Sequence, residues 1–249
     1  MQKVNAEFVR HGFASKASLH EYIEATSEIG LWESEKILFS KYLKKDDRIL
    51  DLGCGTGRIT FPLHQMGYKN IVGLDISSEM LAEAQRLNHE LQGKIEFVLG
   101  DATALNYVAK SFDVVLFAYN GLMQIPWLEN RKKAFSEICR ILKPGGCFIF
   151  TTHDMEAEQD SYYFWREERL RWEKGRQNPR LAEFGDVIYQ SGDCEMFMHV
   201  PKREEILSCI EENSFLLIED HFRPEIFDES NAVKEFSDEC RFWVCQKKD

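Results

Sequence analysis

Residues 49–58 combine an apolar run, an acid and three alternating glycines, a pattern that is typical of a ligand-binding loop. The apolar run predicts a buried strand that ends at Asp51. Gly53, Gly55 and Gly57 then allow a sharp backbone turn with no Cβ in the way. A helix is expected from Arg58 onward, and its N-terminal N–H groups would face a ligand. The segment therefore predicts a nucleotide-like cofactor lying against the turn.

The glycine spacing distinguishes two kinds of cofactor loop. A dinucleotide fingerprint, G-x-G-x-x-G, needs a glycine at position 58, where this chain carries Arg58. The third glycine is Gly57 instead, which leaves an NAD-linked oxidoreductase as the less favoured alternative. The spacing acid-x-G-x-G-x-G, which begins at Asp51, resembles the first motif of class I S-adenosylmethionine-dependent methyltransferases.

Four further segments follow in the order that this family has, and the resemblance covers residues 46–152. The first of them predicts an apolar strand ending in Asp75, twenty positions after Gly55. A carboxylate there can accept hydrogen bonds from both ribose hydroxyls of an adenosine. Asp75 alone does not separate the methyl donor from NAD, and it could also act only as a helix cap. The order of all five segments is what favours the methyltransferase family.

The resemblance also assigns roles to residues at the other strand ends. It implies that Asp101 lies beside the adenine amino group and that Tyr119 and Asn120 flank the transferable methyl. Tyr22 and Trp32 lie in a segment that closes over the methionine end in the family, where an aromatic face can meet a sulfonium, although core packing is open for both. The expected contacts of S-adenosylmethionine, or of its product S-adenosylhomocysteine, are Asp51, Gly53, Cys54, Gly55, Gly57, Arg58, Asp75, Ile76, Asp101, Ala102, Ala118, Tyr22 and Trp32.

The fold class implied by the resemblance is α/β, with a Rossmann-like doubly wound sheet. Seven strands are expected in the order 3-2-1-4-5-7-6, with the last strand antiparallel. Residues 215–220 and 241–246 predict the sixth and seventh strands. The expected units are an N-terminal helical segment over the cofactor (1–45), a methyltransferase core (46–152 and 201–249) and an inserted α+β substrate cap (153–200).

The inserted cap carries two features of its own. Residues 184–190 and 194–200 alternate around a Ser-Gly-Asp turn, which predicts a hairpin that roofs the substrate. Residues 165–180 hold six basic and three acidic side chains, a local net of +3, together with two tryptophans. This stretch is either an exposed amphipathic helix with Glu–Arg pairs or a surface that attracts an anionic or aromatic substrate.

Transfer of an activated methyl group requires little from the protein. The acceptor must be held in line, water must be excluded, and a base is needed only for some acceptors. His153, which follows the fifth strand, is the first candidate base because an unperturbed imidazole titrates near neutral pH. Asp154 or a cap residue could orient it, and a surface role for His153 is equally open. His199 in the hairpin is a second candidate.

Composition excludes several classes of protein. The formal charge of −11 disfavours a broad nucleic-acid surface. Seven cysteines without a C-x-x-C pair do not resemble a disulfide framework or a zinc site. The first residues lack the apolar run of a secretion signal, and no window is apolar enough for a membrane span. A soluble cytoplasmic protein with reduced thiols is expected, with no metal site and no membrane partner.

The departures from known subfamilies narrow the expected acceptor. Asn120 is followed by Gly-Leu rather than Pro-Pro, unlike amino-group DNA methyltransferases, and no cysteine lies between Cys54 and Cys139 for covalent chemistry on a pyrimidine. The core resembles the group that includes ubiquinone and menaquinone biosynthesis methyltransferases. We therefore expect methyl transfer to an oxygen or nitrogen of a small molecule. The alternatives are a tRNA wobble-uridine methyltransferase, faintly resembled in the cap, and a non-catalytic donor-binding protein.

Overall fold

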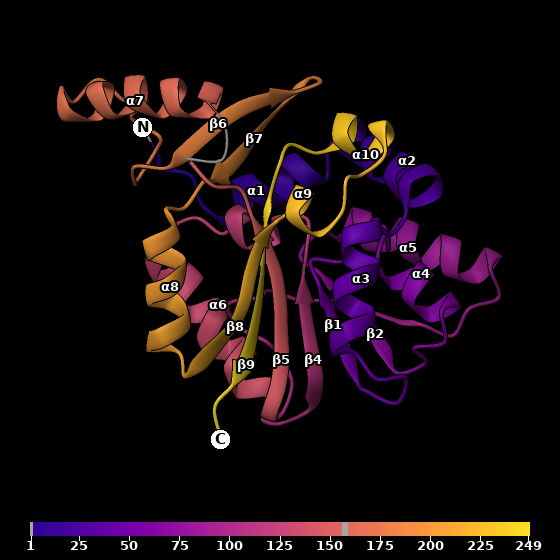
Figure 1. Cartoon of the computed structure of the whole chain (residues 1–249). Helices are drawn as coiled ribbons and strands as arrows, with labels where there is room; N and C mark the ends of the chain where they lie inside the picture. Colours follow the sequence, from indigo (N-terminus) through magenta and orange to yellow (C-terminus); the bar gives the residue numbers. More distant parts are fainter. Residues whose placement is uncertain (1, 156–158) are drawn as a thin grey trace.

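A single seven-stranded sheet organises the chain, whose computed structural model describes residues 2–155 and 159–249. The strand order is β3-β2-β1-β4-β5-β9-β8 (Figure 1). The strands of this sheet are β1 (Ile49–Leu52), β2 (Ile71–Asp75), β3 (Glu96–Leu99), β4 (Phe112–Phe117), β5 (Leu142–Thr152), β8 (Phe215–Phe222) and β9 (Arg241–Lys247).

The pairing directions are those of a doubly wound methyltransferase sheet. β1 pairs in parallel with β2 and β4, whereas β9 is antiparallel to both β5 and β8. The predicted order 3-2-1-4-5-7-6 is therefore confirmed, because β9 and β8 are the seventh and sixth strands once the two cap strands are set aside.

Helices flank both faces of this sheet and extend beyond its ends. Ser77 caps α5 by accepting from the Met80 N–H. The helical elements are α1 (Ala6–Phe13), α2 (Lys16–Glu24), a π-helical turn (Ala25–Ile29), α3 (Glu33–Tyr42), α4 (Thr60–Gln65), α5 (Ser78–Glu90), a 3₁₀ turn (Gly121–Gln124), α6 (Leu128–Ile141), α7 (Gln159–Glu173), α8 (Arg203–Glu212), α9 (Arg223–Ile226) and α10 (Asn231–Phe236).

Helix α6 ends just before the Lys-Pro-Gly-Gly sequence. Its last residue is Ile141, and β5 begins at Leu142. Lys143 precedes Pro144, and a residue before proline is pushed toward extended conformations. The register between β4 and β5 shifts at this point, so the Pro-Gly turn interrupts the pairing rather than stopping the helix itself.

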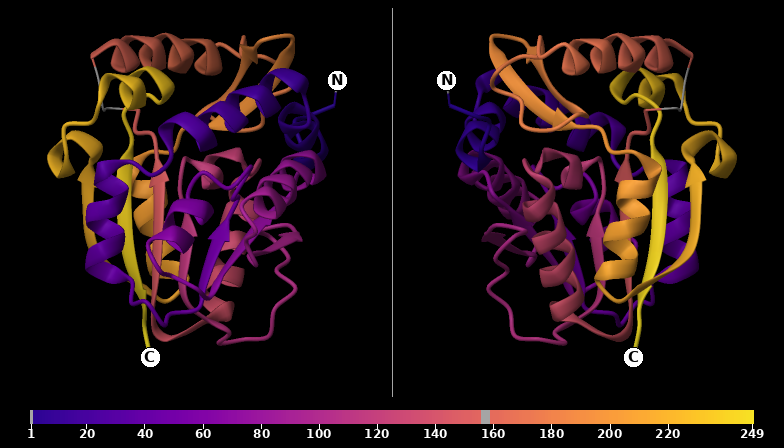
Figure 2. Two further views of the ribbon diagram at one scale, coloured as in Figure 1. Left: turned by 90° about the vertical axis from the view of Figure 1, so that its right-hand side faces the viewer. Right: turned by 90° about the vertical axis from the view of Figure 1, so that its left-hand side faces the viewer.

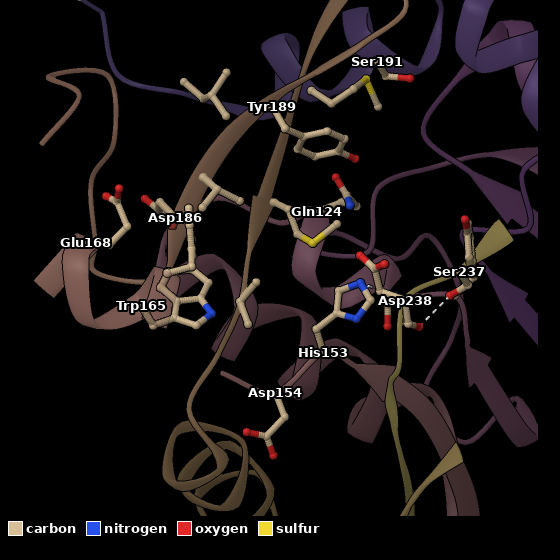
Figure 3. A pocket seen from close by; sticks show the side chains of 18 of the residues that line it. Gln124, His153, Asp154, Trp165, Glu168, Asp186, Tyr189, Ser191, Ser237 and Asp238 are labelled. Atoms are coloured by element: carbon tan, nitrogen blue, oxygen red, sulfur yellow. Dashed lines mark hydrogen bonds between the residues drawn. The ribbon is translucent and has the colours of Figure 1, made fainter. Parts of the chain in front are cut away.

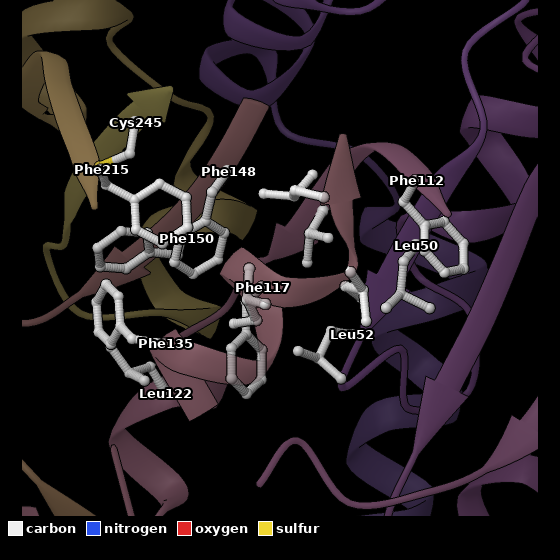
Figure 4. Packing of buried hydrophobic residues seen from close by; sticks show 14 of the residues in the cluster. Leu50, Leu52, Phe112, Phe117, Leu122, Phe135, Phe148, Phe150, Phe215 and Cys245 are labelled. Carbon is white, nitrogen blue, oxygen red and sulfur yellow. The ribbon is translucent and has the colours of Figure 1, made fainter. Parts of the chain in front are cut away.

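Apolar side chains of the central strands alternate between two cores. Val115 and Phe117 of β4 pack on the side of α6 and α8, while Val114 and Leu116 pack on the side of α3 and α4. The first core contains a run of aromatic rings, in which Phe150 stacks on Phe148 with ring centroids 4.6 Å apart (Figure 4). Burial on both faces explains the continuous apolar runs of the parallel strands.

A small second layer lies above the carboxyl ends of the parallel strands. β6 (Asp186–Ser191) and β7 (Cys194–His199) form an antiparallel hairpin, at the place where the alternating sequence predicts one. The hairpin and α7 lie at the end of the sheet opposite the C-terminus in both views of Figure 2. Helix α1 packs against β7, so the N-terminal segment and the hairpin share this layer.

Two further observations concern the cysteines and the character of the helices. All seven cysteines lie within the described residues and carry free thiols. In the described part of the chain, no helix combines the length and apolar character that crossing a membrane requires.

The aromatic core predicts a large stability effect at Phe148. This side chain is fully buried and contacts the rings of Phe135, Phe150 and Phe215. Phe148→Ala should lower the free energy of unfolding by about 3–5 kcal/mol, because it leaves a cavity that the packed rings cannot close. Leu216→Ala, at a side chain that is 52% exposed, is the control and should change stability by less than about 1 kcal/mol. Urea unfolding curves measure both, and equal effects would contradict the layered core.

Candidate active site

The turn after β1 approaches the C-terminal edge of β2. The Gly53 and Cys54 N–H groups both donate to the Leu74 carbonyl, at 2.7 and 3.0 Å, which folds the turn against the neighbouring strand. Gly55 has a φ of +54°, and a Cβ placed there would lie 3.3 Å from the Tyr22 ring. A side chain at position 55 would therefore be strained and would push against the N-terminal segment.

Asp75 joins this turn to the start of α5. Its Oδ2 accepts from the Gly55 N–H and its Oδ1 accepts from the Ser77 N–H, both at 2.8 Å. Burial raises the pKa of Asp75, and these backbone donors oppose that rise. A carboxylate has about four lone-pair positions, so each oxygen keeps acceptor capacity for a further hydroxyl.

Arg58 connects the turn to the N-terminal segment through a buried ion pair. Its guanidinium donates to both oxygens of Glu35 on α3, at 2.6 and 2.8 Å, and to the Gly30 carbonyl at 2.8 Å. The Glu35 side chain is fully buried, and the Arg58 guanidinium carbon lies 4.8 Å from the Trp32 ring. Removing one partner would leave an uncompensated buried charge. Arg58 thus holds the N-terminal segment against the glycine turn.

The end of β4 carries two consecutive residues in a left-handed backbone conformation. Tyr119 and Asn120 have φ values of +49° and +61°, which is uncommon for residues other than glycine. Strain of this kind gathers at functional sites, where the surrounding structure holds it. The Tyr119 ring meets the Tyr22 and Trp32 rings edge-on and stacks on Phe236 at 4.9 Å. An aromatic boundary therefore forms above the end of β4.

A cleft beside the glycine turn is lined by most of the residues expected to hold the cofactor. Gly57 and Trp32 are not among its lining residues in the described part of the chain. Gly57 has a φ of +98° and packs against Phe61, while Trp32 is buried behind Tyr119. The expected residues that do line the cleft are Asp51, Gly53, Cys54, Gly55, Arg58, Asp75, Ile76, Asp101, Ala102, Ala118 and Tyr22.

A second, larger cavity of about 1000 Å³ lies between the strand ends and the cap. Figure 3 shows His153, Gln124 and Tyr189 around the same space, with Asp238 nearby. Three residues, Tyr22, Tyr119 and Gln124, line both this cavity and the cleft beside the glycine turn. The two spaces therefore meet at this shared boundary, at the carboxyl edge where open α/β sheets bind ligands.

Hydrogen-bond geometry assigns the tautomer of His153. Its Nδ1 lies 2.8 Å from the Glu239 main-chain oxygen, which can only accept, so Nδ1 carries the hydrogen. In the neutral ring Nε2 then accepts from Asn120 Nδ2 at 3.1 Å. The lone pair that a general base would use is therefore engaged by Asn120. The Asp154 carboxylate lies 3.3 Å from Arg241 Nε.

His199 lies in a buried ionic network and does not line the large cavity. Its ring nitrogens lie 2.8 Å from Asp186 and 3.1 Å from Glu205, and Arg131 lies 3.1 Å from Nε2. Burial lowers the pKa of His199, but the bonds to Asp186 and Glu205 outweigh it and the net shift is upward. Arg131 also donates to Glu183 at 2.7 Å. These charges join α6 and α8 to the hairpin, a structural arrangement rather than a free base.

Several lining residues were missed by sequence analysis. Glu21 reaches the large cavity from α2, Phe236 from the end of α10, and Asp238 and Glu239 from the loop before β9. No local pattern distinguishes them, because the tertiary fold brings both segments over the end of β4. Gln124 ends the 3₁₀ turn that follows Asn120, and its spacing from Asn120 gives no helical signal in the sequence.

Comparisons with known proteins agree with this geometry. A family model described as a methyltransferase domain matches residues 49–146. A demethylmenaquinone methyltransferase from Lactococcus lactis is 38% identical over 152 residues, which are 59% of this chain and 58% of that protein. A malonyl-[acyl-carrier protein] O-methyltransferase from Legionella pneumophila is 30% identical over 210 residues, 82% of this chain and 68% of that protein.

A solved structure gives the same fold. An S-adenosylmethionine-dependent methyltransferase from Methanosarcina mazei has a TM-score of 0.69 at 21% identity, covering 88% of this chain and 99% of that one. The chain belongs to the class I S-adenosylmethionine-dependent methyltransferase family. It covers less than two thirds of the length of the first curated relatives it matches, 58% in the Lactococcus protein.

The residues present fit the cofactor of this family, S-adenosylmethionine. Asp75 retains acceptor positions for the ribose hydroxyls, and Gly55 leaves room where a Cβ would meet Tyr22. The Asp101 carboxylate is held by the Thr103 N–H and hydroxyl at 2.7 and 2.8 Å beside the same cleft. The rings of Tyr22 and Tyr119, which meet edge-on, also line this cleft.

The buried carboxyl group of Asp51 should make the free energy of unfolding depend on pH. Burial raises the pKa of Asp51 from 3.8 to about 7, while the Thr60 hydroxyl partly opposes the rise. The folded state thus holds this proton more tightly than the unfolded state, so stability falls as pH rises from about 4 to about 7. Asp51→Asn removes the titrating group and with it this loss of stability. The difference in free energy of unfolding between Asp51→Asn and the unmodified chain should therefore rise by at least about 1 kcal/mol from about pH 5.5 to about pH 8.

Urea unfolding of both proteins across this range measures the difference. Asp193→Asn, at an exposed position of the hairpin turn, is the control and should show no such trend. A pH-independent difference between Asp51→Asn and the unmodified chain would show that Asp51 is ionised in the folded state.

Proposed function

We propose that this chain transfers a methyl group from S-adenosylmethionine to an oxygen or nitrogen atom of a small molecule. The observation that carries the proposal is the shared boundary of the two spaces, formed by Tyr22, Tyr119 and Gln124. A cofactor beside the glycine turn would direct its reactive end across that boundary. When bound, S-adenosylmethionine supplies a methyl carbon that is already activated by its sulfonium.

The volume of the larger cavity and the charge of the chain favour a small acceptor. Its volume of about 1000 Å³ is at the upper end for small-molecule sites. The hairpin, α7 and the loop before β9 all contribute residues to its lining. The net charge of −11 opposes a long phosphate backbone. These features support a small molecule over tRNA, although Arg171 and Arg176 line the α7 side.

Within this proposal the residues of the chain mainly position the reactants. Tyr22 and Tyr119 exclude water from the boundary between the two spaces. Asn120 and His153 line the acceptor cavity, and the hydrogen bond between them fixes the orientation of the Asn120 amide. Positioning of this kind accounts for much of the barrier lowering when the leaving group is already activated.

Cofactor binding is tested by thermal unfolding. S-adenosylhomocysteine at about 100 times its Kd should stabilise the chain by about 2.7 kcal/mol. For a chain of this size that corresponds to a rise in Tm of about 5–10 °C, and NAD should give none. Asp75→Ala should lose more than half of this shift, because the ribose hydroxyls lose their acceptor. Asp193→Ala, at an exposed turn, should keep it, and stabilisation by NAD alone would reject the cofactor assignment.

The role of His153 is tested by turnover with the best acceptor from a panel of small phenols, amines and acids. His153→Ala should lower kcat at least about tenfold with the affinity for S-adenosylhomocysteine unchanged. His153→Gln offers an oxygen that can still accept from Asn120, so it should recover activity if His153 only positions Asn120. It should stay as inactive as His153→Ala if His153 is a base.

The control for this series is His221→Ala, at a half-exposed side chain on β8 that does not line the cavity. Unchanged turnover in His153→Ala would remove His153 from the site. Methyl transfer to tRNA, and not to the small-molecule panel, would favour the tRNA methyltransferase alternative. Cofactor binding with no transfer to either class would favour a non-catalytic donor-binding protein.

A further inference from the structure

We propose that the methyl acceptor is a nitrogen atom of an amine, recognised by side-chain oxygens of Asn120, Gln124 and Glu239. This inference rests on the proposed function, because it names the acceptor atom for the same site. It narrows the oxygen-or-nitrogen choice to one element and predicts the charge of the ligand. The observations that carry it are unpaired acceptors, the sign of the lining charges and the boundary with the cofactor cleft.

Three buried oxygens at the large cavity lack a hydrogen-bond donor. Among the described residues, the unpaired buried side-chain atoms that belong to lining residues are Asn120 Oδ1, Gln124 Oε1 and Glu239 Oε2. Asn120 Oδ1 and Glu239 Oε2 are acceptors, and the Gln124 amide can present either its oxygen or its NH₂ group at this place. Glu239 Oε1 accepts from Arg223 at 2.9 Å, and Asn120 is only 4% exposed. Buried polar groups in proteins are nearly always paired, so such a set needs donors from elsewhere. An amine nitrogen supplies N–H donors, whereas a carboxylate or phenolate supplies none.

The orientation of the Asn120 amide follows from its neighbours rather than from an arbitrary choice of atoms. The Glu239 main-chain oxygen requires a hydrogen on His153 Nδ1, which leaves Nε2 of the neutral ring as an acceptor. Asn120 must therefore turn its NH₂ group toward His153. Its Oδ1 is then the atom without a donor, as an amine-binding site requires.

The lining charges near this boundary are mainly negative. Glu21 and Asp238 line the cavity and raise the pKa of Tyr119 and Tyr189, although burial is the larger cause for both tyrosines. Arg171 and Arg176 lie at the α7 side, where Arg171 pairs with Glu168. Two buried cations oppose these charges: Arg58 lies 5.5 Å from the Tyr119 ring and lowers its pKa, and Arg223 pairs with Glu239 at 2.9 Å. Acidic side chains still outnumber basic ones among the described residues that line the large cavity.

The sign of these charges fits nitrogen chemistry and opposes oxyanion chemistry. The ammonium ion that the acids attract first loses a proton to water. The resulting neutral amine then uses its lone pair to form the N–CH₃ bond while the C–S bond breaks and its electron pair stays on sulfur. The positive charge passes from sulfur to nitrogen, and the new methylammonium keeps its protons until it releases one to water. Carboxylates stabilise charge that develops on nitrogen. Methylation of a carboxylate or phenolate would need donors or cations instead.

Gln124 brings a side-chain amide to the boundary where the reaction would occur. Gln124 lines both the acceptor cavity and the cofactor cleft, together with Tyr22 and Tyr119. An amine that donates to Gln124 Oε1 and Asn120 Oδ1 would hold its nitrogen beside the shared boundary. The tyrosine rings add faces that attract a cation.

The first test measures binding rather than turnover, with the full chain saturated with S-adenosylhomocysteine. Phenethylamine, phenethyl alcohol and 3-phenylpropionate are matched in size and differ in the polar group. Isothermal titration should give phenethylamine at least about tenfold tighter binding than 3-phenylpropionate, because the unpaired oxygens and carboxylates repel an anion. Equal affinities, tighter binding of the acid, or no measurable binding of the amine would overturn the proposal.

Variants separate the contributions of charge and of hydrogen bonding. Glu21→Gln combined with Asp238→Asn should weaken phenethylamine about 3- to 10-fold and leave phenethyl alcohol unchanged. Glu204→Gln, at an exposed acid on α8, is the charge-matched control and should have no effect. Gln124→Met keeps the side-chain length but removes the acceptor, and it should also weaken the amine. Retained affinity for S-adenosylhomocysteine shows that each variant is folded.

Tyramine identifies the acceptor atom, because it carries both an amine and a phenol. With methyl-labelled donor, tandem mass spectrometry should place the label on nitrogen, and label on the phenol oxygen would overturn the proposal. A failure of the proposed function looks different, because S-adenosylhomocysteine would then neither bind nor stabilise the chain. Normal binding of S-adenosylhomocysteine with a preference for oxygen acceptors rejects the nitrogen assignment alone.

Discussion

The rest of the site depends on a buried carboxylate at the end of β2. Asp75 accepts one main-chain N–H from the glycine turn and another from the start of α5, both at 2.8 Å. The glycine turn after β1 and the loop between β2 and α5 are thereby fixed relative to each other. Because the carboxylate is buried, water competes weakly for these bonds, and the unused lone pairs remain directed at the cleft. The proposed adenosine site would be an extension of this internal contact.

Two buried ionic contacts hold the N-terminal segment and the hairpin against the core of the protein. Arg58 and Glu35 hold the N-terminal segment against the glycine turn, so that Tyr22 reaches Gly55. Arg131 joins α6 to the hairpin and α8 through a network of acids and His199. Buried ion pairs add little net stability but make misplacement costly, since a separated partner would remain as an unpaired charge. Both contacts therefore favour one arrangement of these segments around the large cavity.

The parts of the site that sequence could predict are those with a local cause. The glycine turn and Asp75 were predictable, because positive φ angles and a strand-terminal acid leave signatures within a few residues. Arg58 was interpreted only as a residue that excludes a dinucleotide loop, and its partner Glu35 was not anticipated, since the pair joins elements 23 positions apart. His199 was proposed as a base from its residue type, whereas burial with Asp186 and Glu205 gives it a structural role.

The sequence by itself determined the positions of the central strands and of the glycine turn, because apolar runs, glycine turns and strand-end acids act over short stretches of chain. The strand order and the expected cofactor residues followed from the resemblance of these segments to a known family. The tertiary structure alone decided the lining of the large cavity. Glu21, Gln124, Asp238 and Glu239 meet above β4 only after α2, the 3₁₀ turn and the loop before β9 have packed together. It also decided the state of His153, whose partners are 33 and 86 positions away. Contacts between such distant segments follow from packing of the whole chain, and no local pattern encodes them.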